Sequence, residues 1–171
     1  MSVQEEWEEI IKQRRQRALE KYGDYPTPGH KVLDIGVGES PHKDATDAID
    51  VTSRDLMFWP LKNLAQTHFV RDSATNLPYK ADTFDKVYAT RVFKKEKKYV
   101  DPLRGVTEAY RVLRPGGKLV ITSWKKDIPE VIDFLESHKA RYSVRYDKRD
   151  PWGKDQLVLI AFKPLRQVID E

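Results

Sequence analysis

The chain has no cysteine and no long apolar segment among its 171 residues. Without cysteine, disulfides, thiolate–metal sites and cysteine nucleophiles are excluded, and four histidines remain as soft ligands, so we expect no metal site. No apolar run approaches the ~20 residues that span a bilayer, and the first twenty residues are mostly charged and amphipathic. We therefore expect no membrane contact, no export signal and a cytoplasmic location.

The composition is typical of one globular domain. Hydrophobic residues make up 39% of the chain and charged residues 34%, enough for a single core under a heavily solvated surface. Lys and Arg number 31 against 27 Asp and Glu, which gives a net charge of +4. This mild excess permits contact with an anionic partner without requiring one.

An amphipathic helix is expected ahead of the main domain. Apolar residues recur at helical spacing among Glu, Lys and Arg over residues 3–22, and Gly23 and a turn-rich connector follow. We therefore divide the chain into an N-terminal helix at residues 1–25, which docks on the body, and a main domain at residues 26–171.

From residue 31 onward, short apolar runs alternate with helical or polar stretches, the pattern of βαβ units. Turn residues before the last run suit an antiparallel return. The fold class is therefore α/β, a doubly wound, mostly parallel, seven-stranded sheet with a C-terminal antiparallel hairpin. The expected strands lie at residues 31–35, 45–51, 68–72, 86–90, 118–123, 141–146 and 156–162.

Two helices have clear start signals. Asp101 followed by Pro102 is an N-cap with proline at the first helical position, and residues 115–117 are expected to end that helix. Asp127 with Glu130 three positions later has capping-box spacing. The apolar faces expected to be buried are Leu103, Val106, Tyr110 and Leu113 in the first helix, and Ile128, Val131, Ile132 and Leu135 in the second.

The strongest functional signal lies in residues 32–41. An apolar strand runs into Gly36 and Gly38, so backbone can approach a ligand closely at the carboxyl end of the first strand, where open α/β sheets bind ligands. Ser40 and Pro41 then have the pattern of a helix start, whose free amide groups suit an anionic part of a ligand. The alternative is that the two glycines serve only a tight turn.

Two carboxylates follow at the ends of the next strands. Asp50 ends the second strand, where a carboxylate can accept hydrogen bonds from both ribose hydroxyls of a nucleoside. Asp72 ends the third strand, where it can accept a bond from an adenine amino group. The alternatives are a turn residue at Asp50 and a salt bridge from Asp72 to Arg71 or Lys80.

These positions resemble the class I S-adenosylmethionine-dependent methyltransferases, which have a Rossmann-like fold. The resemblance covers residues 31–162 and implies S-adenosylmethionine as the cofactor and methyl transfer as the activity. Five features match in order: the turn at Leu33–Gly38, the acid Asp50, residues 72–78, Phe84–Asp85, and residues 112–119.

The resemblance also assigns cofactor-binding roles, and Val51 and Thr90 are further candidates of the same kind. It implies that Asp34, Gly36, Val37 and Gly38 hold the methionyl end, Asp50 the ribose, and Asp72, Ser73 and Ala74 the adenine. Two departures stand out, because Ser40 occupies the family's third glycine position and few residues remain for the first crossover. The helix there can be no more than a turn or so, since a βαβ crossover usually takes ~10–12 residues.

No catalytic residue is assigned. Methyl transfer from a sulfonium is an in-line displacement that needs alignment and exclusion of water rather than a protein nucleophile. Candidates for a general base are His42, Tyr88, Thr90 and Asp72, although a neutral amine acceptor would need none. The alternative for His42 is an exposed position in the first short helix.

The segment after the fourth strand is strongly basic and carries Arg91, Lys94, Lys95, Lys97 and Lys98. With Lys125 and Lys126, and with Phe93, Tyr99 and Trp124 interleaved, it could form a positive rim for an anionic or nucleic-acid partner. The alternative is a solvated loop whose lysines touch nothing.

The acceptor is expected to be a small molecule, with protein or RNA as the alternatives. Residues 89–92 lack the Asn/Asp-Pro-Pro-aromatic pattern of related enzymes that methylate nucleobase amines, and Leu77-Pro78 resembles the small-molecule branch of the family. Two other functions stay open. One is a non-catalytic binding or scaffolding subunit, and the other is a nucleic-acid-binding protein that uses residues 91–98.

Overall fold

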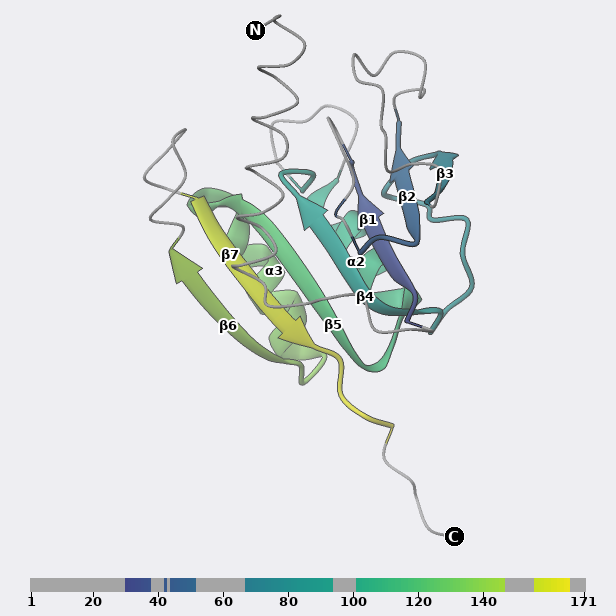
Figure 1. The fold of residues 1–171 in the computed structure, drawn as a ribbon. Helices are drawn as coiled ribbons and strands as arrows, with labels where there is room; N and C mark the ends of the chain where they lie inside the picture. Colours follow the sequence, from purple (N-terminus) through teal and green to yellow (C-terminus); the bar gives the residue numbers. More distant parts are fainter. Residues whose placement is uncertain are drawn as a thin grey trace, which may run out of the picture.

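The computed structural model describes residues 30–37, 42, 44–51, 67–93, 101–146 and 156–166 (Figure 1). The helix expected at residues 1–25 lies outside these ranges. The described strands are β1 (Val32–Ile35), β2 (Asp47–Asp50), β3 (His68–Arg71), β4 (Phe84–Thr90), β5 (Leu113–Trp124), β6 (Arg141–Tyr146) and β7 (Gln156–Phe162). The described helices are α2 (Pro102–Val112), the short 3₁₀ turn η3 (Lys125–Asp127) and α3 (Ile128–Ser137).

The strands form one sheet in the order β3-β2-β1-β4-β5-β7-β6. Strands β1 to β5 pair in parallel, whereas β7 runs antiparallel to both β5 and β6. The predicted α/β class, the mostly parallel seven-stranded sheet and the terminal hairpin are confirmed. β6 and β7 have the predicted bounds.

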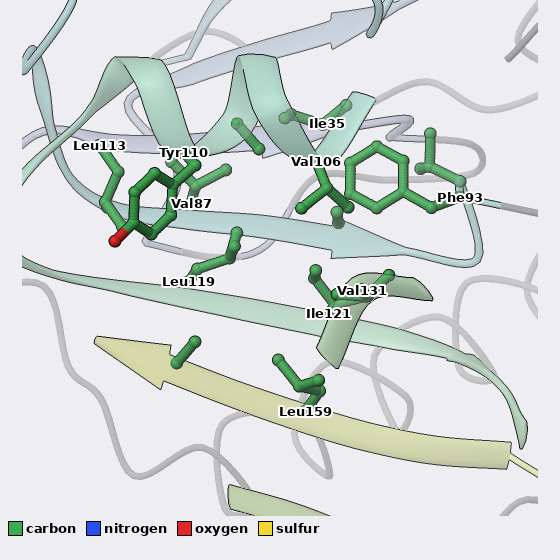
Figure 2. Packing of buried hydrophobic residues seen from close by; sticks show 14 of the residues in the cluster. Ile35, Val87, Phe93, Val106, Tyr110, Leu113, Leu119, Ile121, Val131 and Leu159 are labelled. Atoms are coloured by element: carbon green, nitrogen blue, oxygen red, sulfur yellow. The ribbon is translucent and has the colours of Figure 1, made fainter. Parts of the chain in front are cut away.

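The sheet separates two apolar clusters. Helices α2 and α3 lie on one face (Figure 1), where Val106 of α2 and Val131 of α3 meet the inward residues of β4, β5 and β7 (Figure 2). Because side chains alternate along a strand, the neighbouring residues point to the opposite face. The smaller cluster there consists of Val32, Tyr88, Val120, Val158 and Ile160. Asp34 and Thr90 share this second face.

Strand β5 begins at Leu113, earlier than predicted, and includes residues 115–117. Leu113 pairs with Phe84 of β4. The Gly116 amide donates to the Lys163 carbonyl at 2.9 Å, and the Lys163 amide donates to the Gly117 carbonyl at 3.0 Å. The prediction that residues 115–117 end the helix is therefore wrong. The helix ends at Val112, and the Pro-Gly-Gly segment is held in the sheet by Lys163.

The start of α2 is confirmed and the capping box of α3 is not. The Asp101 carboxylate accepts hydrogen bonds from the amides of Leu103 and Arg104 at 3.0 and 3.4 Å. Asp127 makes no capping bond with its side chain, because its backbone is already helical in the preceding 3₁₀ turn. In α2, Val106 and Tyr110 are buried as predicted, whereas Leu103 is exposed. Leu113 is buried in β5, and in α3 Ile128, Val131 and Leu135 are buried while Ile132 is partly buried.

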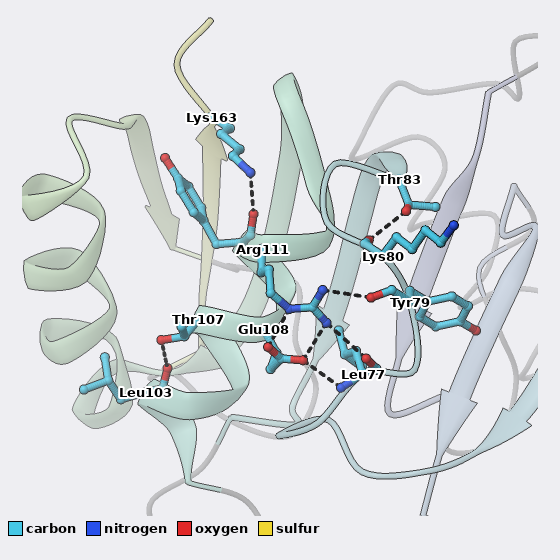
Figure 3. A network of polar contacts seen from close by, with 10 residues as sticks. Leu77, Tyr79, Lys80, Thr83, Leu103, Thr107, Glu108, Arg111 and Lys163 are labelled. Carbon is cyan, nitrogen blue, oxygen red and sulfur yellow. Dashed lines mark hydrogen bonds and ion pairs between the residues drawn. The ribbon is translucent and has the colours of Figure 1, made fainter. Parts of the chain in front are cut away.

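Helix α2 also holds the segment between β3 and β4 (Figure 3). Arg111 donates to the carbonyls of Tyr79 and Leu77 at 2.8 and 3.0 Å, and Glu108 accepts from the Leu77 amide at 2.8 Å. The side chains of Arg111 and Glu108 pair at 2.7 Å, and this hydrogen bond holds the pKa of Glu108 below its usual range. The loop that carries Asp72 is therefore tied to the main core.

Replacing Arg111 by methionine is expected to lower the free energy of unfolding by about 2–3 kcal/mol, because two carbonyls lose charged donors. Urea unfolding at pH 7 measures the loss. Arg104 is exposed on the same helix, and Arg104→Met should change stability by less than about 0.5 kcal/mol. Equal effects of the two substitutions would contradict the role given to Arg111.

Among the described residues, no helix is both long enough and apolar enough to cross a bilayer.

Candidate functional site

The carboxyl ends of β1, β2, β3 and β4 lie side by side at one edge of the sheet (Figure 1). Ile35 of β1 is opposite Ile49 of β2 and Ala89 of β4. Asp50 is opposite Arg71 of β3. The structure therefore brings the predicted residues of four strand ends to one edge, where open α/β sheets bind ligands.

Asp34 is a buried carboxylate on the face of the sheet away from α2 and α3. Its Oδ2 accepts a hydrogen bond of 2.7 Å from the His42 amide. Burial raises the pKa of Asp34 to about 6; His42 opposes this rise, and the carboxylates of Asp44 and Asp50 add to it. Such an acid is costly to ionise alone and is stabilised by an added positive charge.

Gly36 has a backbone conformation that other residues rarely adopt, with φ at +68°. Its amide donates to the Ile49 carbonyl at 2.8 Å, and a Cβ atom at this position would collide with the Val92 side chain. The fold by itself thus requires glycine here, and the ligand-binding role of Gly36 stays a prediction. Val37 is buried next to it, whereas Gly38, Ser40 and Pro41 lie outside the described residues.

Asp50 ends β2 and is half-buried. Its carbonyl accepts the Asp72 amide at 3.1 Å, which ties the end of β2 to the loop after β3. Val51 is half-exposed, and its carbonyl accepts a bond of 3.1 Å from Nε of Arg71. Arg71 is therefore directed at the end of β2.

The loop after β3 is held by its own side chains. Oδ1 of Asp72 accepts the Ser73 amide at 2.7 Å, and Oγ of Ser73 lies 2.8 Å from the Thr75 hydroxyl. Ala74 is buried beneath this turn. Within the described residues, Asp72 forms no ion pair with Arg71 or Lys80, so the salt-bridge alternative is wrong. The role of Asp72 toward adenine stays a prediction.

Thr90 ends β4 opposite Thr122 of β5. The next residue, Arg91, has a φ of +57°, and its amide donates to the Thr122 carbonyl at 2.7 Å. Phe93 is buried in the main core (Figure 2). Its ring lies where a Cβ atom on Gly105 would be. The expectation that Phe93 belongs to a basic rim is therefore wrong.

The rest of the basic segment cannot be placed in the site. Lys94, Lys95, Lys97, Lys98 and Tyr99 lie outside the described residues. Lys125 and Lys126 follow β5 and are exposed. Contact of this segment with an anionic or nucleic-acid partner stays a prediction.

Two of the candidate bases are held together. The rings of His42 and Tyr88 stack with centroids 3.8 Å apart and planes 9° apart. The Tyr88 hydroxyl donates to Oδ2 of Asp44 at 3.2 Å. His42 is half-buried, which contradicts the exposed alternative, and the Tyr88 hydroxyl is engaged as a donor rather than placed as a base.

Sequence reasoning missed Asp44 and Lys86. Nζ of Lys86 lies 3.2 Å from Oδ2 of Asp44, and the two side chains are only 12% and 1% exposed. Oδ1 of Asp44 is buried without a hydrogen-bond partner. A lysine inside an apolar strand was the available signal, because a buried lysine needs a paired acid.

Comparison with known proteins identifies the family. A family model described as a methyltransferase domain matches residues 33–121, which run from β1 into β5. A demethylmenaquinone methyltransferase of Clavibacter sepedonicus is 33% identical in an alignment 152 positions long, which covers 74% of this chain and 61% of that protein. One of Paenarthrobacter aurescens (strain TC1) is 32% identical over 106 residues, 58% of this chain and 41% of the relative. The matched regions thus span 41% and 61% of these relatives' lengths.

A solved structure shows the same fold. The N-methyltransferase NodS from Bradyrhizobium japonicum WM9 superposes with a TM-score of 0.66, covering 90% of this chain and 96% of NodS at 16% identity. The family match and the shared Rossmann-like fold agree with the alignment of strand ends described above. The chain therefore belongs to the class I S-adenosylmethionine-dependent methyltransferases, a family whose cofactor is S-adenosylmethionine.

Proposed function

We propose that this chain binds S-adenosylmethionine at the carboxyl edge of β1 to β4 and transfers its methyl group to a small-molecule acceptor. The observation that carries the proposal is that three acids lie near adjacent strand ends: Asp34 is the second-last residue of β1, Asp50 is the last of β2, and Asp72 follows β3. Three acids at one edge repel one another, so their presence there is best explained by a ligand rich in hydrogen-bond donors.

The chemistry of these acids fits the cofactor. S-adenosylmethionine carries an ammonium group, two ribose hydroxyls and an adenine amino group, all of which are donors to a carboxylate. Asp34 would hold the ammonium group, Asp50 the ribose and Asp72 the adenine. Because burial raises the pKa of Asp34, a bound cation would stabilise its ionised form more than that of the other two acids.

The protein's own residues would bind and orient rather than react. Bound S-adenosylmethionine supplies the methyl group on a sulfonium, and displacement requires an acceptor in line with the carbon–sulfur bond. Gly36 lets the backbone turn sharply beside Val92, and Thr90 ends β4 at the same edge. The Tyr88 hydroxyl already donates to Asp44, so we assign no general base.

A small-molecule acceptor is supported by two observations. The relatives of Clavibacter and Paenarthrobacter are named for methylation of demethylmenaquinone, a small molecule. The Leu77-Pro78 stretch, which resembles the small-molecule branch in sequence, is held against α2 by Arg111 and Glu108 at Leu77.

Replacing Asp50 by alanine is expected to weaken the binding of S-adenosylhomocysteine by on the order of 1–3 kcal/mol, because the ribose hydroxyls lose a charged acceptor. Isothermal titration calorimetry measures the change. Asp47 lies at the opposite end of the same strand, so Asp47→Ala is the matched control and should leave the affinity within about twofold.

The same titration distinguishes a methyltransferase that binds the cofactor from a non-catalytic scaffolding subunit. Unchanged affinity in Asp50→Ala would contradict the assignment of the ribose to Asp50. No heat from the unaltered chain with S-adenosylmethionine or S-adenosylhomocysteine at millimolar concentration would favour a non-catalytic binding subunit.

A further inference from the structure

Tyr88 contacts the connection between β1 and β2 at two points. Its ring stacks on His42 and its hydroxyl donates to Asp44, two residues further along the chain. Tyr88 is itself buried in the middle of β4, directly opposite Asp34 in the register of β1. Tyr88 on β4 thus contacts two residues of this connection, and Lys86 of the same strand pairs with one of them, Asp44.

The remaining described bonds of this connection fix mainly its end near β2. The Thr46 amide donates to the Val32 carbonyl at 2.9 Å, and the Ala45 amide donates to the His42 carbonyl at 3.0 Å. His42 in turn presents its amide to Asp34 at 2.7 Å. The stack of the His42 ring on Tyr88 therefore contributes to the position of this amide.

We propose that Tyr88 is a positioning residue for the cofactor site. Through its contacts with His42 and Asp44, Tyr88 maintains the hydrogen bond from the His42 amide to the Asp34 carboxylate. This bond orients Asp34 to bind the cofactor's ammonium group. The inference rests on the proposed function, because it concerns the same acid.

The charges around Asp34 give the proposal a pH signature. Asp44 and His42 face it from the connection, Asp50 from β2, and Lys86 lies with Tyr88 on β4. Burial raises the pKa of Asp34 to about 6, while the amide and charge of His42 oppose the rise. Loss of the His42 amide therefore raises this pKa further and leaves less of the carboxylate ionised near neutral pH.

The test measures S-adenosylhomocysteine affinity by calorimetry from pH 5.5 to 8.5. In Tyr88→Leu, which removes the stack and the hydroxyl, we expect the midpoint of the pH profile to rise by about one unit. Affinity at pH 6 should then fall about fivefold, because the ionised fraction of Asp34 drops from about one half to about one tenth. Tyr88→Phe keeps the ring and should lie between Tyr88→Leu and the unaltered chain. His42→Ala keeps the backbone amide but removes both the stack and the charge of the ring, and each loss should shift the midpoint in the same direction. Tyr88→Leu, which leaves the His42 ring in place, is therefore the deciding variant.

Val120→Ala is the matched control for a loss of packing. Val120 belongs to the same apolar cluster as Tyr88, on β5 opposite it, and is placed away from the connection. This variant should lower the melting temperature without moving the pH midpoint. The proposal would be overturned if the pH midpoint of affinity in Tyr88→Leu and His42→Ala were equal to that in Val120→Ala.

A second readout needs no cofactor. The pKa of Asp34 can be obtained from the pH dependence of unfolding, by comparison with Asp34→Asn in each background. It should rise in Tyr88→Leu and His42→Ala, and an unchanged value in both would overturn the positioning role. Absence of S-adenosylhomocysteine binding in every variant, together with a raised Asp34 pKa, would instead count against the proposed function alone.

Discussion

Replacing Lys86 by methionine is expected to lower the free energy of unfolding by about 3–5 kcal/mol, because it leaves the buried Asp44 carboxylate without its positive partner. Asp44 is almost fully enclosed, and among the described residues Oδ2 would keep only the Tyr88 hydroxyl as a partner. Within the same part of the chain, Oδ1 already has no hydrogen-bond partner. Methionine has nearly the volume of the lysine stem, so the loss comes from charge rather than from a cavity.

The double variant Lys86→Met with Asp44→Asn separates charge from packing. Removing both charges should recover most of the lost stability, since a buried ion pair is close to neutral overall while a lone buried charge is costly. Urea unfolding at pH 7 of the two single variants and the double variant measures this coupling. Additive losses would show that the pair does not act as a unit.

Replacing Asp34 by asparagine is expected to stabilise the protein above pH 6 while it weakens cofactor binding. The pKa of Asp34 is raised from 3.8 to about 6, so the folded state holds its proton more tightly than the unfolded chain does. This contribution to stability is fully present below pH 3.8 and is lost as the pH rises through about 6. A shift of this size corresponds to on the order of 3 kcal/mol.

Unfolding curves at several pH values from 4 to 8 check the sign. The stability of Asp34→Asn relative to the unaltered chain should be smallest at pH 4 and should level off above pH 7. Binding of S-adenosylhomocysteine should fall at every pH, because asparagine offers the ammonium group no charge. A stability difference that does not change with pH would show that Asp34 is not the group with the raised pKa.

Local patterns explain why much of the fold was predictable. The bounds of β6 and β7 follow from short β-rich runs, and Asp101-Pro102 marks the start of α2 by capping chemistry alone. The start of β5 was not predictable in this way. Pro115-Gly116-Gly117 reads as a break, and only pairing with Lys163, far along the chain, keeps it in the sheet.

The candidate site likewise contains some residues that the sequence indicated and others that only the structure revealed. Asp50 and Asp72 stand out because each lies at the end of a predicted strand, and Asp34 stands out through the family resemblance of its turn. Asp44, Lys86 and the contact between Tyr88 and His42 could not be foreseen, because the residues that meet lie more than forty positions apart in the chain.

The succession of strands along the chain and the spacing of the acids can be read from local sequence, since hydrophobic alternation and turn residues act over a few positions. The sequence by itself therefore determined the α/β class, and it predicts the edge of the sheet at which we propose that the cofactor binds. Only the tertiary structure decided how far the pKa of Asp34 is raised and which residues contact this carboxylate. Both depend on burial and on contacts between strands, which no local pattern contains.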